Sequence, residues 1–273
     1  MSGKAKKLID DLASPSDIRF GIEDDVALIT VDRLADGNRL TPSSLVHLCE
    51  IARTLAADRR TSCVVVTGAG SEFFSSGIFN IELRAAYAKE DALAIVRLAV
   101  DAFDAIEALP QVVIGALNGA VRAGGGELAL ACDFRVCAAH ATLAFHETSY
   151  ACFPGAGAPV RLPAIIGAGR ALEMIATGRE IDAQEMLRIG LVTCIVPQAE
   201  LRATVHRMAA QIAAKGPLGT IGAKKIIRMQ TRSGAEAAHQ LSWELRTALE
   251  YSHDVDEAIA AHLEHRKASY LGC

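Results

Sequence analysis

The sequence has few aromatic residues and no long apolar run. Phe, Trp and Tyr make up only 5% of the 273 residues, which argues against an aromatic-rich binding surface. No stretch of about 18 uncharged apolar residues occurs, so we expect no membrane-spanning helix and no membrane partner. Residues 1–12 are charged and lack an apolar centre, unlike a secretory signal peptide. These features predict a cytoplasmic protein.

Several short motifs of common active sites are also missing from the sequence. No GxGxxG, GxxxxGK[ST], HExxH or GxSxG sequence occurs. The usual marks of dinucleotide, phosphate-loop, zinc-protease and serine-nucleophile sites are therefore absent. The 7 cysteines form an odd set without a CxxC pair, which favours buried thiols in a reducing compartment. We expect no metal and no separate cofactor.

The charge balance argues against a nucleic-acid partner. Lys and Arg number 28 against 32 Asp and Glu, which gives a net charge of −4. The basic residues form no dense stripe of the kind that binds phosphate backbones.

Hydrophobic residues make up 51% of the chain, enough for a sizeable buried core.

The hydrophobic pattern predicts an α/β core in which strands alternate with helices. Pro42 at a first helical position, after the N-cap residue Thr41, marks the start of a helix. A loose strand–strand–helix repeat is visible. We expect a frayed, disordered leader over 1–17, a catalytic core over 18–199 and a helical C-terminal region over 200–273. Strands are predicted at 18–20, 26–31, 63–67, 111–117, 134–138, 142–145 and 193–196, and helices at 42–57, 91–108 and 127–132.

Two glycine-containing turns stand where a strand gives way to a helix, at 73–77 and 123–127. Free backbone N–H groups and the helix dipole favour negative charge at such turns. Brought together, the two turns could bind a developing oxyanion. The glycines could equally do no more than permit tight turns.

Two glutamates lie in apolar surroundings close to these turns. Glu127 opens an otherwise apolar helix, and Glu147 follows an apolar strand. Helix capping for Glu127 and a solvated loop position for Glu147 are the simpler alternatives. Together the two carboxylates suggest an acid–base pair, because burial would raise at least one pKa toward neutrality. His146 could assist as a base or serve only in packing.

With these motifs the chain resembles the enoyl-CoA hydratase/isomerase (crotonase) superfamily. The resemblance covers almost the whole chain, from about Ile18 to Gly272, and rests on five segments in the family's order. These segments are 38–40, 73–77, 118–133, Glu147 with 153–163, and 252–267.

The resemblance implies a fold and a substrate. The implied fold is an α/β spiral of ββα units with a C-terminal helical region that forms a homotrimer, which can pair into a hexamer as a dimer of trimers. The implied substrate is an acyl-CoA thioester, so coenzyme A would enter as part of the substrate.

The matched motifs also imply roles for individual residues. The N–H groups of Ser76 and Gly124 would form the oxyanion hole. Glu127 would activate a water molecule, and protonated Glu147 would deliver a proton to Cα. The residues expected to contact the acyl-CoA are Arg39, Leu40, Gly77, Ile78, Phe79, His146 and Lys267.

Phe79 and His146 depart from the family pattern, which has an acid and a proline at these positions. Retention of both glutamates favours an enoyl-CoA hydratase. The departures leave open enoyl-CoA isomerisation, C–C hydrolysis or thioester hydrolysis on the same enolate. A non-catalytic binding paralogue is the third reading, although such a protein would more usually have lost one of the glutamates.

Overall fold

The first two predicted strands form an antiparallel hairpin of β1 (Ile18–Glu23) and β2 (Val26–Val31). The structure is a computed structural model that describes residues 3–273. From β2 onward the same sheet is parallel, in the order β1-β2-β3-β5-β7-β10. The later strands of this sheet are β3 (Cys63–Gly68), β5 (Val112–Leu117), β7 (Phe134–Ala138) and β10 (Cys194–Val196).

A second, smaller sheet has the order β4-β6-β8-β9. Its first three strands are parallel, and β9 is antiparallel to β8. Along the chain, β3, β5 and β7 of the large sheet are each followed by a strand of the small sheet. This alternation confirms the ββα spiral. The strands of the small sheet are β4 (Phe73–Ser75), β6 (Ala120–Arg122), β8 (Thr142–Ala144) and β9 (Ile181–Asp182).

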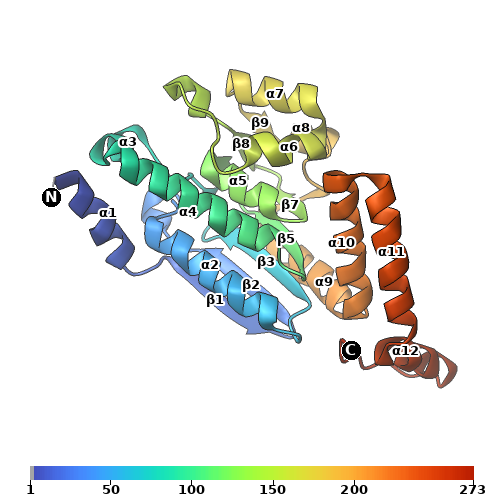
Figure 1. Ribbon diagram of the computed structural model, residues 1–273. Coiled ribbons are helices and arrows are strands. Elements are labelled where there is room, and N and C mark those ends of the chain that lie inside the picture. The colour runs from blue at the N-terminus through green and yellow to red at the C-terminus, as the bar shows by residue number, and fades with distance from the viewer. Residues whose placement is uncertain (1–2) are drawn as a thin grey trace.

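Helices cover both faces of the large sheet (Figure 1). In β3, Val64 and Val66 belong to the core beneath α2, α4 and α5, whereas Cys63 and Val65 belong to a separate cluster against α9. Burial on both faces explains why β3 is a continuous apolar run rather than an alternating pattern. These helices are α2 (Pro42–Ala57), α4 (Lys89–Glu107), α5 (Gly124–Ala131) and α9 (Gln198–Ala213).

The start of α2 follows the predicted capping chemistry. Pro42 is its first residue, and the Thr41 side chain accepts a hydrogen bond from the N–H of Ser44 at 3.1 Å. Shorter segments cross the upper part of Figure 1. They are α3 (Ile81–Ala86), the 3-10 turn η2 (Glu147–Tyr150), α6 (Ala158–Ile166), α7 (Ala168–Thr177) and α8 (Ala183–Arg188); a second 3-10 turn, η1 (Leu34–Asp36), follows β2.

The C-terminal part is helical, as expected, and its first helix is part of the packed core. Helix α9 packs on the large sheet through Leu201, Val205 and Ala209. The hairpin of α10 and α11 stands at one end of the molecule, with α12 beneath it (Figure 1). The bounds are α10 (Pro217–Ser233), α11 (Ala235–Glu250) and α12 (His253–Leu263).

The expected leader over 1–17 contains a helix in the part that the structure describes. Residues 3–13 form α1 (Gly3–Ala13), which lies beside α2, and Leu8 packs against the main core. The hydroxyl of Tyr87 also donates a hydrogen bond to Asp11. The sequence of a short, charged segment does not reveal tertiary contacts of this kind.

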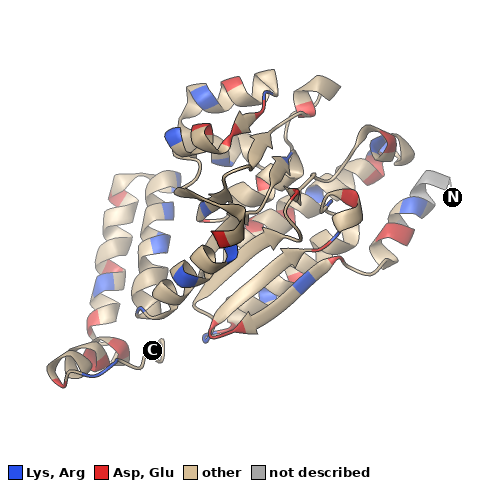
Figure 2. Ribbon diagram, turned by 180° about the vertical axis from the view of Figure 1, so that it is seen from behind, with Lys and Arg blue, Asp and Glu red and all other residues tan. Residues whose placement is uncertain are grey.

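Basic and acidic positions are interspersed over most helices, whereas α10 carries basic positions only (Figure 2). Within residues 3–273, no helix is long and apolar enough to cross a bilayer.

Candidate active site

Glu127 lies in the first turn of α5 and is almost completely buried, with 2% of its surface exposed. Its Oε1 accepts hydrogen bonds from the N–H groups of Ala156 at 2.7 Å and Ala158 at 3.0 Å. Burial and, to a smaller extent, the charge of Glu147 raise the pKa of Glu127 to about 7 against the opposing effect of the two N–H donors. The carboxyl is therefore held in place and can titrate near neutral pH.

Glu147 opens η2, after the buried strand β8. Its Oε2 is buried and has no hydrogen-bond partner among the described residues. Burial raises the pKa of Glu147 to about 7. A carboxyl oxygen without a donor favours the protonated form, whereas the two N–H groups on Glu127 favour its anion. The pair is therefore suited to hold one proton, on Glu147, at neutral pH.

We expect the variant Glu147→Gln to be more stable than the wild type in alkaline solution. The pKa of Glu147 is about 7 in the folded protein, above the ordinary glutamate value of 4.5, so folding favours the protonated form. Stability is lost as the pH rises from about 4.5 through 7, because the buried group must ionise. Glutamine does not ionise, so the variant should gain about 1–3 kcal/mol at pH 8 and little at pH 4.

Urea unfolding of both proteins across this pH range measures the difference. A constant difference between the two free energies of unfolding at pH 4 and pH 8 would contradict a raised pKa at Glu147.

The three glycines at the start of α5 allow this helix to approach two other segments closely. A Cβ on Gly125 would lie 2.6 Å from the carbonyl oxygen of Ser75, and one on Gly126 would lie 2.7 Å from the Phe145 ring. A Cβ on Gly124 would lie 2.8 Å from the Ile78 side chain and 3.5 Å from its backbone nitrogen. The glycines therefore do more than permit a turn: they let α5 pack against the 75–78 segment.

The expectation that the N–H of Ser76 is a free oxyanion donor is wrong. This N–H donates to the carbonyl oxygen of Gly37 at 2.8 Å, and the N–H of Gly77 donates to Ser75 Oγ at 3.1 Å. The N–H groups of Ile78 and Gly124 have no acceptor within residues 3–273. The sequence shows a turn at 73–77 but cannot show which N–H groups the turn itself consumes.

Two asparagines fix the segment that leads to Ile78. Asn38 Nδ2 donates to the carbonyl oxygens of Ala69 at 2.9 Å and Phe73 at 2.6 Å. Asn118 Nδ2 donates to the Phe73 carbonyl oxygen at 3.0 Å, and its Oδ1 accepts from the N–H of Gly68 at 3.0 Å. These buried amides satisfy the backbone of a tight connection between β3 and β4.

Four more of the residues expected to contact the acyl-CoA lie close to Ile78 or beside Glu147. Gly77 (φ +98°) and Phe79 flank Ile78, and the Phe79 ring meets Tyr87 edge-on with 6.0 Å between ring centroids. Leu40 is fully buried, so its side chain belongs to the core, and only its backbone reaches the turn through a 2.8 Å bond to the Gly77 carbonyl. His146 adjoins Glu147 and is half-buried, with no side-chain hydrogen bond in the described part of the chain.

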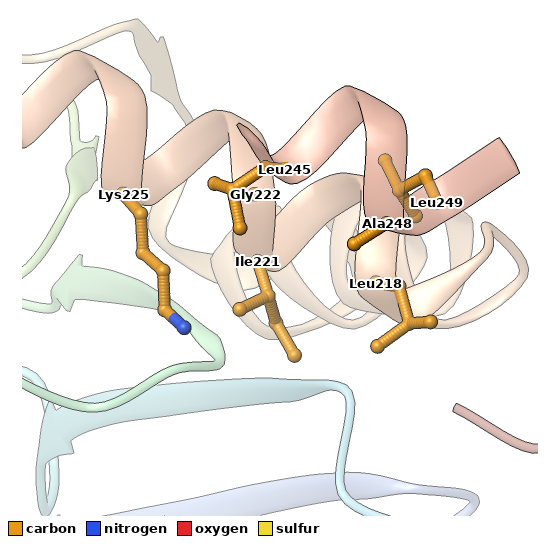
Figure 3. Close-up of a pocket in the computed structure, with 7 residues that line it drawn as sticks. All are labelled: Leu218, Ile221, Gly222, Lys225, Leu245, Ala248 and Leu249. Atoms are coloured by element: carbon orange, nitrogen blue, oxygen red, sulfur yellow. The ribbon is translucent and has the colours of Figure 1, made fainter. Parts of the chain in front are cut away.

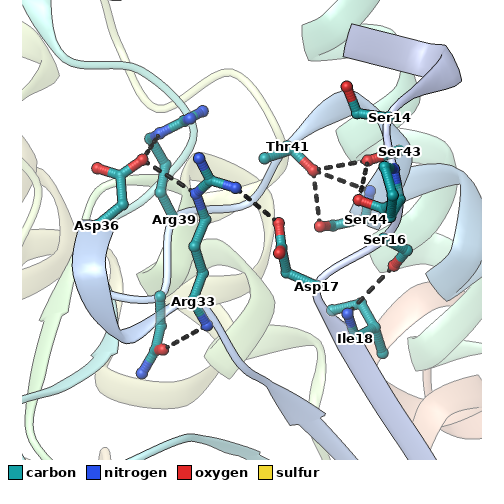
Figure 4. Close-up of polar contacts among 12 residues, drawn as sticks. Ser14, Ser16, Asp17, Ile18, Arg33, Asp36, Arg39, Thr41, Ser43 and Ser44 are labelled. Carbon is teal, nitrogen blue, oxygen red and sulfur yellow. Dashed lines mark hydrogen bonds and ion pairs between the residues drawn. The ribbon is translucent and has the colours of Figure 1, made fainter.

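Arg39 lies at the edge of a polar network around the start of α2 (Figure 4). Its Nε is 2.6 Å from Asp36 Oδ2, and Arg33 bridges Asp36 and Asp17 at 3.1 and 2.8 Å. A small polar cavity opens here beneath α1. Its lining includes Lys7, Asp11, Asp17, Arg33, Arg39, Thr41 and Ser43.

Lys267 is not brought to this site within one chain. It is exposed and follows α12, at the opposite end of the molecule from α3 and α6 (Figure 1). Arg122 turns away from the glycine turn and pairs with Glu180, and it also donates to Thr142 Oγ1 at 2.8 Å.

A further hollow lies between α10 and α11 (Figure 3). Its walls are mainly aliphatic, and Lys225 is its one titratable residue, so it offers no acid–base pair. The lining residues are Leu218, Ile221, Gly222, Lys225, Leu245, Ala248 and Leu249.

The spiral thus brings two protonatable carboxyls close to two backbone N–H groups without acceptors in residues 3–273. An arrangement of this kind suits an α/β enzyme that stabilises negative charge on a carbonyl oxygen and moves protons.

Comparison with known proteins gives the same class. Residues 21–272 match the family model for enoyl-CoA hydratase/isomerase. The crotonyl-CoA hydratase of Syntrophomonas wolfei is 30% identical over 252 residues, covering 91% of this chain and 95% of that protein. The carnitinyl-CoA dehydratase of Escherichia coli K12 is 35% identical over 221 residues, covering 78% and 80%.

The similarity extends to solved structures. An enoyl-CoA hydratase from Bacillus anthracis superimposes with a TM-score of 0.91 at 34% identity, covering 94% of this chain and 100% of that one. The chain belongs to the enoyl-CoA hydratase/isomerase (crotonase) superfamily.

Proposed function

We propose that this protein is an enoyl-CoA hydratase that adds water across the double bond of a 2-enoyl-CoA thioester. The observation that carries the proposal is a pair of glutamates, each with a pKa of about 7. Glu127 is buried and anchored by two N–H donors, whereas half-buried Glu147 has a buried oxygen without a partner among the described residues. Relatives named for hydration and dehydration of CoA thioesters support the same substrate class.

In this mechanism Glu127, as the anion, orients a water molecule and accepts its proton. The resulting hydroxide bonds to C3 of the substrate, and the double-bond electrons move onto the thioester oxygen. Protonated Glu147 then gives its proton to C2. A proton returns from Glu127 to Glu147 to restore the starting state, so each turnover consumes one water molecule, with its OH on C3 and one hydrogen on C2. A general acid and a general base each contribute about 10²–10⁴-fold in rate.

The thioester oxygen of the enolate would lie between the N–H groups of Ile78 and Gly124. This replaces Ser76 with Ile78 as the first donor of the oxyanion hole. Donors that are fixed before the reaction stabilise developing charge without reorganisation. Arg39, Phe79 and the backbone of Leu40 and Gly77 would border the acyl-CoA, and coenzyme A would enter as part of the substrate without a separate cofactor.

Another reaction of the same enolate is the second candidate, and His146 is the observation that favours it. Its imidazole adjoins Glu147 and has no hydrogen-bond partner within residues 3–273. A free imidazole of this kind could move a proton in isomerisation or in C–C or thioester hydrolysis.

Turnover of crotonyl-CoA in H₂¹⁸O separates these reactions. Hydration places ¹⁸O on C3 of an intact CoA thioester, which is the expected result. Thioester hydrolysis places ¹⁸O in a free carboxylate with release of CoA, and isomerisation of crotonyl-CoA to its 3-enoyl isomer incorporates none. Either of these latter products as the main one would refute the hydratase assignment.

We also propose that the protein assembles as a homotrimer or as a dimer of trimers through its C-terminal helices. Large apolar side chains are exposed there, which is unusual for a surface that remains in water. They include Ile227, Trp243, Tyr251 and Leu263, each more than 60% exposed. Sedimentation equilibrium should give a mass of three or six chains, and a stable monomer would refute this assembly.

A further inference from the structure

Arg161, on α6, is a buried arginine with 8% of its side chain exposed. Its Nη1 donates to the carbonyl oxygen of Ala156 at 3.0 Å, and its Nε donates to Glu107 Oε2 at 2.8 Å. Its Nη2 also pairs with Asp104 on α4. A guanidinium that is held by several acceptors at once has a fixed position.

The peptide segment that Arg161 holds is the one that holds Glu127. The N–H groups of Ala156 and Ala158 bind Glu127 Oε1, and the carbonyl oxygen of Ala156 binds Arg161. Gly157, at φ +121°, lies between them, and a Cβ on it would overlap Arg161 Nη1. The glycine therefore leaves the space into which the guanidinium fits.

Several charged groups face Glu127 from the elements packed around α5. Arg161 lowers the pKa of Glu127, whereas Glu147 raises it. Arg161 also neutralises the two acids on α4. Glu147 and Arg161 act on Glu127 directly, and Asp104 and Glu107 of α4 pair with Arg161.

We propose that Arg161 is a positioning residue for Glu127, which fixes the 156–158 segment through the Ala156 carbonyl and keeps the Glu127 carboxylate ionised and aimed at the reacting water. This proposal rests on the proposed function. Arg161 does not touch the substrate and acts only through Glu127.

The outer end of the network supplies a matched control. Glu107 Oε1 accepts a hydrogen bond at 2.8 Å from Arg232 on α10, whose side chain is 64% exposed. Arg232 shares the Glu107 partner but does not touch the 156–158 segment. The variants Arg161→Met and Arg232→Met therefore remove the same chemical group at the inner and outer ends of one network.

The test compares kcat, KM and their pH dependence for crotonyl-CoA in the wild type and in three variants. Arg161→Met should lower kcat roughly 10- to 100-fold with KM within about twofold, because a misplaced base slows the chemical step. The acidic limb of the pH profile of kcat should move to higher pH in Arg161→Met, because the Glu127 anion loses a nearby positive charge. Arg161→Lys should keep the acidic limb near its wild-type position, and Arg232→Met should resemble the wild type.

A folded Arg161→Met protein with wild-type kcat and an unmoved acidic limb would overturn the proposal. The proposal would also be overturned if kcat fell equally in Arg161→Met and Arg232→Met and in proportion to their loss of thermal stability. That result would indicate a structural role only.

A second readout keeps this inference separate from the proposed function. Titration of ¹³C-labelled glutamate carboxyls by NMR, with Glu127→Gln to assign the signal, reports on Glu127 without turnover. If the wild type does not hydrate crotonyl-CoA, the hydratase proposal fails. The role of Arg161 is then supported by an upward shift of the Glu127 titration in Arg161→Met and refuted by an unchanged one.

Discussion

Replacement of Glu127 by glutamine should lower kcat for crotonyl-CoA hydration by about 10²–10⁴-fold. Glutamine can still accept the hydrogen bonds from Ala156 and Ala158, which are 2.7 and 3.0 Å from Oε1 in the wild type. It cannot take a proton from water, so substrate binding should persist while the chemical step fails. Steady-state kinetics with crotonyl-CoA, together with the Kd for a saturated acyl-CoA, measure the two effects separately.

Glu264→Gln is the matched control for this substitution. Glu264 is a surface residue with 61% of its side chain exposed, paired with Arg266. The change of charge is the same, and wild-type kinetics are expected. Wild-type kcat in folded Glu127→Gln would contradict a role for Glu127 as the base.

Replacement of Gly125 by alanine should reduce kcat by about 10²-fold, a loss comparable with the removal of one oxyanion-hole donor. The new Cβ would lie 2.6 Å from the Ser75 carbonyl oxygen and 2.7 Å from the Ser75 Cβ. Backbone atoms cannot move aside as a flexible side-chain end can, so α5 should shift away from the 75–78 segment. The N–H groups of Gly124 and Ile78 would then no longer converge.

Gly169→Ala is the control for a glycine-to-alanine change in a helix. A Cβ on Gly169 of α7 would meet no atom within 4 Å, so this variant should keep full activity and stability. Far-UV circular dichroism and thermal unfolding of Gly125→Ala establish that it folds. A folded Gly125→Ala protein with wild-type kcat would contradict the placement of the oxyanion hole between these two segments.

Much of the fold could be predicted from the sequence where local signals agreed with the tertiary structure. The hairpin of β1 and β2 has charged turn residues between apolar runs, and α2 begins with a capping threonine and a proline. The two glutamates could be identified because a carboxyl in an otherwise apolar segment conflicts with simple burial.

The missed elements are short and depend on distant partners. Strands β4 and β6 have three residues each, and their pairing brings Phe73 opposite Ala120 across a large separation in sequence. The sequences of such short segments resemble those of turns, and only pairing within the small sheet makes them strands. The segment 73–77, predicted to be a turn between a strand and a helix, therefore contains a strand over its first three residues.

Residue roles that depend on the direction of single N–H groups were beyond the sequence. Ser76 and Ile78 flank the same glycine, and only the bond from Ser76 to Gly37 shows which donor is consumed. Arg161 belongs to the 153–163 segment, which resembles the family, but its contact with Ala156 is visible only in the three-dimensional structure.

Mixing the wild type with crotonyl-CoA and following the absorbance of the conjugated thioester tests the central claim most directly, with Glu147→Gln measured in parallel. A rapid fall in absorbance for the wild type, slowed about 10²–10⁴-fold in the variant, is the predicted result for a general acid at this position. Constant absorbance in a wild-type protein that still binds the CoA thioester would contradict the hydratase assignment.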